Sequence, residues 1–441
     1  MRRVAVVGSG IAGLSAAWTL APHAQVTLFE AGEHFGGHTH TVDVTLDGVT
    51  HGVDTGFLVY NERTYPNLIR LFQALQVETA LSDMSFSVQA PATTRSGRLE
   101  WSGSDLNGLF AQRRNALRPG FWRMLRDLLR FNRLCTELAQ RYEDSSLGQM
   151  IGTFLDEHRF SAEFRDWYFL PMIGCIWSCP TEQMLQFPIG TMIRFCHNHG
   201  LIQIADRPRW FTVKGGARQY VQKMLAGIDD ARLAAPVRSV RRVRTGHAGS
   251  GGVVVTSSAG TERFDEVVLA CHSDQSLALL ADPTPAEREV LGAIRYHPNR
   301  AVLHTDTSML PLSRRAWAAW NYERAANGSR EHASVCLHYL LNKLQPLPFT
   351  TPVVVSLNPQ REPRGDSVLG DFAYAHPVFD LAATAAQRRV PELQGSAHTW
   401  FCGAWTRYGF HEDGLMSGLA VAAALKARWA ANAAELSLEA A

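Results

Sequence analysis

The chain has 441 residues, which is too long for one ordinary domain and suits two lobes that each have a hydrophobic core. Apolar residues make up 46% and charged residues 19%, a balance that excludes a disordered chain. The net charge of +2 gives no general attraction to nucleic acid. Seven cysteines without a Cys-x-x-Cys pair predict neither a zinc site nor a disulfide framework and favour a reducing cytoplasm. No apolar run is long enough to cross a bilayer.

The first 31 residues carry a nucleotide-binding pattern. Residues 3–7 form an apolar run typical of a buried parallel strand, and a G-x-G-x-x-G turn and a predicted helix follow. The free amides at such a helix start suit a pyrophosphate. The next predicted strand, QVTLFE, ends in Glu30, where an acid accepts the ribose hydroxyls of an adenosine and disfavours the 2′-phosphate of NADP. The residues expected at the cofactor are Gly8, Gly10, Ile11, Ala12, Gly13, Glu30 and Ala31.

A second glycine pair, Gly36-Gly37, follows closely, and it favours a flavin over a nicotinamide cofactor. It resembles the extended motif E-x-x-x-x-x-G-G-R of the superfamily that includes flavin amine oxidases, phytoene desaturases and protoporphyrinogen oxidases. His38 stands where the arginine is usual, and VDTGFLVYN (53–61) resembles the segment beside the isoalloxazine ring. The resemblance implies FAD as the cofactor, with contacts from Gly36, Gly37, His38, Thr39, Gly56 and Phe57.

Three internal blocks continue the resemblance in the order that the superfamily shows. FTVKGGARQYVQKM (211–224) resembles the internal glycine turn and helix. AAPVRSVRRV (234–243) resembles the strand that brings the Val237 backbone near the adenine, and FDEVVLACH (264–272) resembles the closing strand of the lobe.

The C-terminal block, FCGAWTRYGFHEDGLMSGLAVAAAL (401–425), resembles the last FAD motif of the superfamily. We expect Gly414 to allow a turn that a residue with a side chain adopts poorly. The amides of Leu415 and Met416, at the start of the following helix, would then face flavin N1 and O2 and stabilise negative charge there. Gly403 and Ala404 belong to the same expected cofactor contacts.

Three departures distinguish the chain from its relatives in the superfamily. After FCG the superfamily usually places Asp or Glu, which binds the ribityl chain, whereas this chain has Ala404 and Trp405. Amine oxidases also carry an aromatic residue just after the glycine aligned with Gly414, where this chain has Leu415. They further use an active-site lysine, for which Lys343 is the conceivable candidate. These departures favour an apolar substrate over an amine.

The resemblance implies an α/β fold, with a Rossmann-type FAD-binding lobe of the glutathione-reductase-like, amine-oxidase type and an inserted α+β substrate lobe. We assign residues 1–100, 206–272 and 396–441 to the discontinuous FAD-binding lobe. Residues 101–205 and 273–395 are assigned to the substrate lobe.

The first insertion contains a predicted basic amphipathic helix. Apolar residues recur at three- and four-residue spacing from Leu117 to Leu138, and residues 113–133 carry seven arginines and one aspartate. Two interpretations remain open, a core-packing stripe with a solvated arginine face and a surface that docks on an anionic membrane. DWYFLPMIGCIWSCP (166–180) is expected either to pack in the core or to wall an acyl tunnel.

The resemblance implies an FAD-dependent oxidoreductase in which hydride passes from a substrate carbon to flavin N5 while a positioned base takes a proton. We expect His411 or Glu412 as the general base, with Tyr60, Asn61 and His376 as further candidates. The alternative for Glu412 is a capping role at the final helix.

The HEDG turn and YAHPVFDLAA (374–383) are most similar to a bacterial group of predicted NAD/FAD-binding amine-oxidase-like proteins, found near cyclopropane-fatty-acid-synthase-like methyltransferases. This implies an unsaturated or methyl-branched fatty acyl chain of a lipid as the substrate, with desaturation, isomerisation and oxidation all open as the reaction. The alternatives are a flavin amine or polyamine oxidase, a carotenoid-type desaturase and a non-catalytic FAD-binding protein. We expect a cytoplasmic enzyme, peripheral on the inner membrane surface if the arginine-rich helix binds lipid; the oligomeric state stays open.

Overall fold

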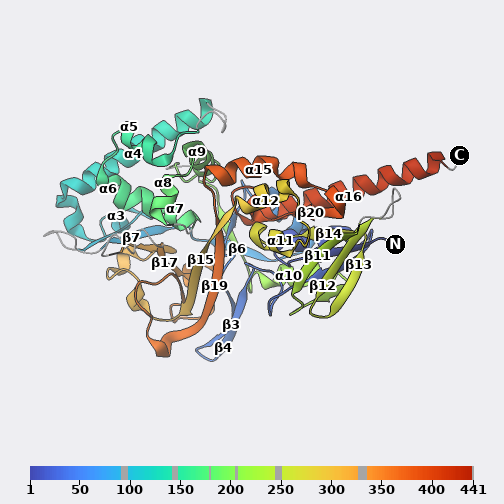
Figure 1. Cartoon of the computed structure of the whole chain (residues 1–441). Helices are drawn as coiled ribbons and strands as arrows, with labels where there is room; N and C mark the ends of the chain where they lie inside the picture. Colours follow the sequence, from blue (N-terminus) through green and yellow to red (C-terminus); the bar gives the residue numbers. More distant parts are fainter. Residues whose placement is uncertain are drawn as a thin grey trace.

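The computed structural model describes residues 1–90, 98–141, 148–177, 180–203, 207–243, 251–325 and 335–439. Two lobes lie side by side, and the C-terminal helix extends away from the lobe that holds the N-terminus (Figure 1). The predicted α/β fold, a Rossmann-type lobe with an α+β substrate lobe, is confirmed.

A five-stranded parallel sheet in the order β10-β2-β1-β14-β20 forms the centre of the first lobe. Its strands are β1 (Arg3–Val7), β2 (Gln25–Phe29), β10 (Asp230–Arg232), β14 (Glu266–Leu269) and β20 (Thr399–Phe401). The middle strand is buried on both faces, as its continuous apolar run predicts. Val4 and Val6 pack into one hydrophobic cluster, and Ala5 and Val7 pack into another on the opposite face.

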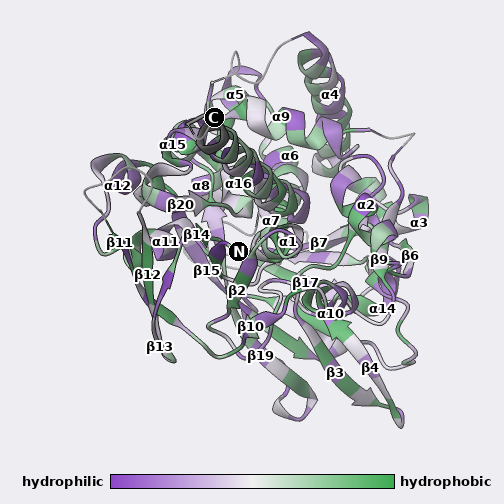
Figure 2. Cartoon of the chain, turned by 90° about the vertical axis from the view of Figure 1, so that its right-hand side faces the viewer, coloured by the Kyte–Doolittle hydropathy of each residue, from purple (hydrophilic) through white to green (hydrophobic). Residues whose placement is uncertain are grey.

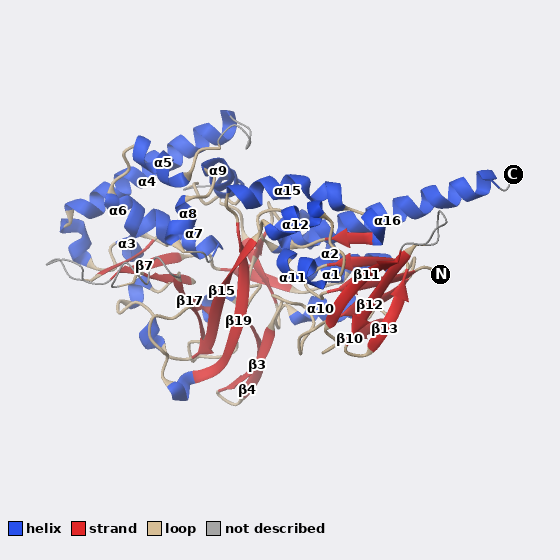
Figure 3. Cartoon of the chain, in the orientation of Figure 1, coloured by secondary structure: helices blue, strands red, loops and turns tan. Residues whose placement is uncertain are grey.

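Helices cover the Val4 side of this sheet, and a smaller sheet with three helices covers the other side (Figure 3). The first layer consists of α1 (Ile11–Leu20), α2 (Pro66–Ala74), α10 (Arg218–Leu225) and α16 (His411–Glu439). The second consists of the antiparallel strands β11 (Val237–Val243), β12 (Gly252–Ser257) and β13 (Gly260–Phe264) with α11 (Ser273–Leu279), α12 (Pro285–Gly292) and α15 (Leu381–Leu393).

The second lobe is built on a seven-stranded sheet in the order β19-β15-β18-β17-β16-β7-β8, in which only the β7–β16 pair is parallel. Its strands are β7 (Phe86–Ala90), β8 (Leu99–Ser102), β15 (Arg295–His304), β16 (Trp320–Glu323), β17 (Cys336–Leu340), β18 (Val354–Leu357) and β19 (Val368–Val378). Because β7 and β8 pair here, whereas α11, α12 and α15 pack on the first lobe, we propose that the second lobe takes residues 83–205 and 295–380. The boundary at 205 itself lies outside the described residues.

Helices cluster above this sheet in the second lobe (Figure 3). They are α3 (Leu106–Leu109), α4 (Pro119–Arg141), α5 (Ile151–Glu157), α6 (Ala162–Phe164), α7 (Leu170–Trp177), α8 (Thr181–Leu185) and α9 (Ile189–Asn198). The predicted core stripe of α4 is buried at Phe121, Met124, Phe131 and Cys135, whereas Leu117 is 85% exposed. Leu117 precedes Pro119, and the chain before a proline leaves the helical conformation, so the arginine-rich segment is split into a short 3-10 turn and α4.

Short strands join the lobes. They are β3 (Thr41–Leu46) paired with β4 (Val49–Asp54), and β9 (Trp210–Val213) paired with β5 (Tyr60–Asn61) and β6 (Thr79–Ser82); α14 (Leu341–Leu344) follows β17. The buried Asp54 carboxylate accepts hydrogen bonds from Thr41, from the Ala217 amide and from Gln345 of the second lobe. Within the described chain, no helix is both long enough and apolar enough to cross a membrane.

Candidate active site

Residues of both lobes line one cavity of 790 Å³, a volume within the usual range of cofactor and substrate sites. The first lobe contributes the turn between β1 and α1, the end of β2, and residues 36–38 and 56–59. The second lobe contributes side chains of α7, α9, β16, β17 and β19.

The glycine turn after β1 leaves a cradle that opens into this cavity. Gly8 has a φ of +101°, and a Cβ at Gly13 would lie 1.9 Å from the Gly8 oxygen, so both positions require glycine. A Cβ at Gly10 would meet no atom within 4 Å. The space before the N-terminus of α1 is therefore free to receive a diphosphate, which its amides and dipole stabilise.

Glu30 lies at the end of β2, where the sequence predicts a ribose contact. One carboxylate oxygen accepts hydrogen bonds from the Ser9 amide (3.0 Å) and the Ser9 hydroxyl (2.5 Å), and the other accepts one from the Gly32 amide (2.8 Å). These donors fix the carboxylate against the glycine turn. It lines the cavity with acceptor capacity left for sugar hydroxyls.

His38 occupies the position where the superfamily motif usually has arginine. Its Nε2 is buried without a hydrogen-bond partner, and the residue lines the cavity. Burial, together with His376, His272 and His411, holds the pKa of His38 well below its usual range, so the ring is neutral. A buried, unpaired ring nitrogen is costly, and a cofactor in the cavity supplies the partner that the protein lacks. The residues present therefore fit FAD.

The structure brings most of the predicted cofactor residues to the cavity. The lining residues among them are Gly8, Gly10, Ile11, Ala12, Glu30, Ala31, Gly36, Gly37, His38, Gly56, Phe57, Val237, Gly403 and Ala404. The predicted residues that lie behind the lining are Gly13, Thr39, Gly414, Leu415 and Met416.

The last three lie behind the lining because α16 begins earlier than expected. The helix starts at His411, and the residue with a positive φ (+90°) is Gly409 rather than Gly414. Gly414 and Gly418 serve close packing instead, since their Cβ atoms would lie 2.8 Å from the Ile11 side chain and 2.1 Å from the Ala12 oxygen. The positive end of the helix dipole is therefore at His411, which lines the cavity.

His411, the first residue of α16, is held in place by Phe57, by Tyr220 of α10 and by Thr39. Its ring stacks on Phe57 with centroids 3.8 Å apart, and its Nε2 lies 2.6 Å from the Tyr220 hydroxyl and 3.4 Å from that of Thr39. Burial lowers the pKa of His411 to about 3. The imidazole is thus neutral at physiological pH and has a free-base nitrogen that can accept a proton.

His376 reaches the cavity from β19 in a fixed tautomer. The Asn299 amide nitrogen donates to His376 Nδ1 over 2.8 Å, and Asn299 is oriented by Asn358, which donates to its oxygen over 2.7 Å. Nδ1 is therefore an acceptor, and Nε2 carries the proton of the neutral ring. Burial lowers the pKa of His376 to about 4, so the ring is neutral at physiological pH, and its tautomer makes Nε2 a hydrogen-bond donor.

Glu412 has a different role from the expected base. Its oxygens accept hydrogen bonds from the Asn67 amide, the Asn67 side chain and the Leu68 amide, each within 2.9 Å, and it does not line the cavity. The carboxylate thus caps the N-terminus of α2. Its neighbour Asp413 accepts a hydrogen bond from the Phe410 amide, and burial raises the pKa of Asp413 to about 7.

Tyr60 and Asn61 also lie away from the cavity lining. The Tyr60 ring packs against aromatic side chains of the core, including Phe72 and Phe211, and Asn61 accepts hydrogen bonds from the amides of a tight turn. Their positions give no access to a substrate.

His272 is a cavity residue that the sequence analysis did not single out. Its ring stacks on Tyr296 with centroids 4.2 Å apart, and burial lowers its pKa. It follows β14, and polar residues just beyond the carboxyl ends of parallel strands are where this fold binds ligands. That rule, applied to the segment FDEVVLACH, could have found it.

The substrate half of the cavity is apolar. Its lining side chains include Met84, Phe86, Met172, Cys175, Ile176, Phe195, Leu201, Trp210, Trp320, Tyr339 and Phe410. Among the described lining residues, Glu30 of the nucleotide half is the single Asp, Glu, Lys or Arg. All four lysines of the chain lie elsewhere, and Lys343 pairs with Asp83 over 3.1 Å on the surface.

Solved structures of several known proteins share this fold. Cyclohexylamine oxidase from Brevibacterium oxydans IH-35A has a TM-score of 0.65 at 17% identity, covering 97% of this chain and 99% of that one. Putrescine oxidase bound to putrescine scores 0.66 at 16% identity with the same coverage. A CLA-producing fatty acid isomerase from P. acnes scores 0.63 at 13% identity, covering 95% and 98%. No curated protein sequence matches.

The sequence profile described as flavin containing amine oxidoreductase matches residues 11–309, a span that begins just after the turn of Gly8 and Gly10 and includes Glu30, His38 and most of the substrate wall. The chain therefore belongs to the flavin-containing amine oxidoreductase family and is an FAD-dependent oxidoreductase.

Proposed function

We propose that this enzyme removes hydride from a carbon of an apolar substrate, an unsaturated or methyl-branched fatty acyl chain of a lipid. The apolar lining of the substrate half of the cavity carries this proposal. An acyl chain buries its methylene groups there at a gain of about 0.8 kcal/mol each. A protonated amine would lose its hydration in the same space without a described carboxylate to pair with.

FAD, when bound, supplies the two-electron acceptor for the hydride. We propose His411 as the acceptor of the accompanying proton, because its ring is neutral, lines the cavity and is backed by the Tyr220 hydroxyl. Tyr220 in turn lies 2.5 Å from the Thr39 hydroxyl, which extends the hydrogen-bonded chain away from the cavity. His376 donates through Nε2 and helps to orient the cofactor or the substrate.

We also propose that α4 docks the enzyme on an anionic membrane, where such a substrate resides. Trp122, Arg126, Leu129 and Arg133 recur at four- and three-residue spacing along one exposed face. The exposed fractions are 52% for Trp122 and 55% for Leu129, high values for large apolar side chains. The alternation of apolar and polar residues along α4 is visible in Figure 2. Apolar insertion and arginine–phosphate attraction act together on such a surface.

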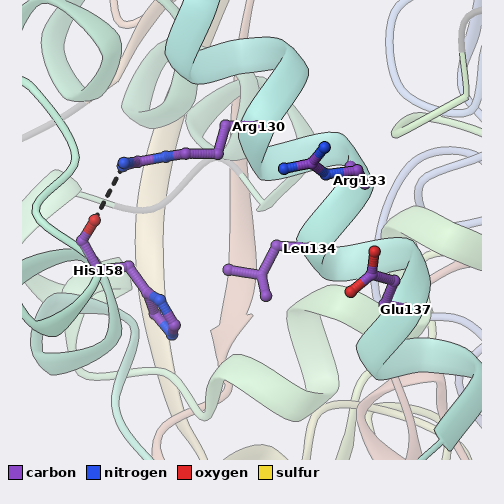
Figure 4. Close-up of a pocket in the computed structure, with 5 residues that line it drawn as sticks. All are labelled: Arg130, Arg133, Leu134, Glu137 and His158. Atoms are coloured by element: carbon purple, nitrogen blue, oxygen red, sulfur yellow. Dashed lines mark hydrogen bonds between the residues drawn. The ribbon is translucent and has the colours of Figure 1, made fainter.

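A hollow of 310 Å³ lies beside α4 and shares Arg133 with this face. It is lined by Arg130, Arg133, Leu134, Glu137 and His158 (Figure 4). Arg130 is turned inward, where it donates to the His158 carbonyl over 2.8 Å and stacks over Phe160. The hollow carries both signs of charge, from Arg130, Arg133 and Glu137.

The test is an anaerobic mixing experiment in which loss of the oxidised-flavin absorbance is followed. The FAD-loaded enzyme is mixed with phospholipids that carry saturated, unsaturated or methyl-branched chains, or with a panel of monoamines and polyamines. We expect bleaching by unsaturated or branched lipid and none by amines. Bleaching by amines alone would refute the proposal and make the chain an amine oxidase, in line with two of the similar structures.

A pair of variants locates the reaction in the cavity. Ile176→Trp fills part of the apolar wall, whereas Leu170→Trp changes the same helix at a residue that does not line the cavity. We expect Ile176→Trp to slow bleaching by lipid and Leu170→Trp to leave it close to the wild-type rate. Equal rates for the two variants would place the acyl chain elsewhere.

A further inference from the structure

A polar cluster lies on the second sheet, apart from the flavin cavity. Glu323 ends β16 and pairs in register with Cys336, the first residue of β17. His338 lies two residues further along β17 and therefore points to the same face of the sheet as Cys336. His338 is fully buried, Cys336 is 3% exposed, and the Glu323 side chain is 21% exposed.

The potential ligand atoms of these residues converge. Glu323 Oε2 lies 2.9 Å from His338 Nε2, Cys336 Sγ lies 3.6 Å from His338 Nε2, and Cys336 Sγ lies 3.9 Å from Glu323 Oε2. In a tetrahedral zinc site with ordinary bond lengths, the S···N and S···O edges are about 3.6 Å and the N···O edge is about 3.3 Å. The triangle in this chain is thus within a few tenths of an ångström of three edges of such a site.

We propose that Glu323, Cys336 and His338 bind a divalent transition metal ion, and that zinc is the ion this ligand set suits best. Thiolate, imidazole and carboxylate form a mixed set that a borderline-soft cation prefers, whereas Mg²⁺ and Ca²⁺ take oxygen ligands. Glu323 is partly exposed at the end of β16, so water has access to the fourth position. This inference is independent of the proposed substrate.

A second layer of hydrogen bonds supports the imidazole ligand. His338 Nδ1 lies 2.6 Å from the Ser356 hydroxyl, and the same hydroxyl lies 2.7 Å from His304 Nε2. The Asp306 amide donates to His304 Nδ1 over 3.0 Å, so Nε2 of His304 carries a proton and donates to Ser356. Metal-bound histidines are typically oriented through the ring nitrogen that is not coordinated, as His338 is here.

Metal binding would move the proton of His338 from one ring nitrogen to the other and release the thiol proton of Cys336. Without metal, His338 donates from Nε2 to Glu323, and the Cys336 sulfur lies near the same carboxylate oxygen as a thiol. With metal, the His338 proton moves to Nδ1 and is donated to Ser356, whose oxygen has a second lone pair for this bond. The thiol proton is released to solvent, and the thiolate bonds to the ion.

The position of the cluster indicates a structural role. Trp320 and Tyr339 lie on the same two strands, pair with each other in register, and line the flavin cavity. An ion that joins Glu323 of β16 to Cys336 and His338 of β17 would fix these strands against each other. It would therefore stiffen one wall of the cavity without touching the cofactor.

The test uses the FAD-loaded enzyme after treatment with a chelator. Added Co²⁺ is expected to give the visible bands of a tetrahedral site and a thiolate charge-transfer band, and Zn²⁺ should displace it at about one equivalent per chain. Cys336→Ser should remove the charge-transfer band and weaken Zn²⁺ binding at least about tenfold, as Glu323→Gln should also do. Glu323→Gln is nearly isosteric and still accepts the His338 hydrogen bond, so this variant tests the ion rather than the fold.

Cys196→Ser provides the matched control, because Cys196 is another buried cysteine of the same lobe and lies next to Met192. It should bind Co²⁺ and Zn²⁺ like the wild type. The proposal is overturned if the wild type takes up no Co²⁺, or if Cys336→Ser and Glu323→Gln bind Zn²⁺ as tightly as it does. The FAD content and the bleaching by lipid are measured on the same samples, so failure here is separable from failure of the proposed reaction.

Discussion

At the scale of single residues, Gly10 and Gly418 are glycines for different reasons. Gly10 leaves room for the cofactor, whereas Gly418 lets two helices pack closely. A Cβ at Gly10 meets no protein atom within 4 Å, whereas a Cβ at Gly418 would lie 2.1 Å from the Ala12 oxygen and 2.2 Å from the Ser15 hydroxyl. We expect Gly10→Ala to fold normally but to weaken FAD binding at least about tenfold, or ~1.4 kcal/mol, because its methyl group intrudes on the cradle. Gly418→Ala should lower the free energy of unfolding by about 1–3 kcal/mol, the usual cost of overpacking.

The two glycine variants are compared by thermal unfolding without FAD and by fluorescence titration with FAD. The cradle assignment would be contradicted if Gly10→Ala bound FAD like the wild type. A Gly418→Ala protein as stable as the wild type would show that α1 and α16 adjust easily.

His411 leads to a prediction on pH. Because burial lowers its pKa to about 3, the imidazole stays in the proton-accepting form at every pH above that value. The rate of flavin reduction by lipid should therefore be nearly constant between about pH 5 and 8. His411→Phe, which keeps the stacking on Phe57, should slow flavin reduction by about 10²-fold or more. A rate that falls below about pH 6.5 would point to a base with an ordinary histidine pKa.

The role of a residue could be predicted from the sequence where it depends on neighbouring residues. It could not be predicted where it depends on a partner far away in the chain. Gly8, Gly10 and Glu30 lie at the cavity because their spacing encodes a strand, a turn and a helix. Glu412 stands beside His411 in sequence, yet its hydrogen-bond partners are the amides of Asn67 and Leu68, on a helix far away in the chain. No local pattern indicates that pairing.

At the scale of elements, the exposed face of α4 is open to a direct test. We expect the double variant Trp122→Ala/Leu129→Ala to reduce binding to vesicles that contain anionic lipid at least about tenfold, because each side chain contributes about 1.5–3 kcal/mol when buried in the interface. The control is Leu381→Ala, since Leu381 is also an exposed apolar residue (42%) but lies on α15. Sedimentation with vesicles measures both proteins.

High salt should weaken the binding of the wild type, because the arginines of α4 contribute through attraction to the anionic surface. If the α4 variant, the control and the wild type sediment equally with vesicles, α4 does not dock on the membrane and its apolar residues serve core packing alone.

Element types followed from periodicity, whereas their ends and partners depended on tertiary contacts. The spacing of apolar residues predicts the helix at α4, but Pro119 sets its start and leaves Leu117 outside the core. The segment 1–100, predicted to belong to the cofactor lobe, includes β7 and the first half of β8, yet both strands lie in the second sheet, because β7 pairs with β16 more than 200 residues later. Pairing over such separations has no local signature.

At the scale of the whole molecule, the buried histidines predict how stability depends on pH. Burial lowers the pKa of His40, His199, His304 and His376 to about 4 in the folded chain. The unfolded chain binds protons at these rings below about pH 6.5, so the folded state loses stability as the pH falls from there to about 4.

Asp54 and Asp413, whose pKa values burial raises to about 7, act in the opposite direction over the same range. Since the histidines outnumber them, we expect a lower free energy of unfolding at pH 5 than at pH 7. Urea denaturation at the two values measures this difference. A protein that is equally or more stable at pH 5 would show that the histidines are protonated in the folded state.

The measurement that tests the central claim most directly is the change in mass of the lipid when it reduces the flavin. The FAD-loaded enzyme is reduced anaerobically by phospholipid, and the lipid is then analysed by mass spectrometry. We expect about one acyl chain lighter by two hydrogens for each flavin reduced, because hydride and proton both leave the chain. Lipid of unchanged mass, together with flavin that is reduced by an amine and yields the corresponding carbonyl product, would contradict the account.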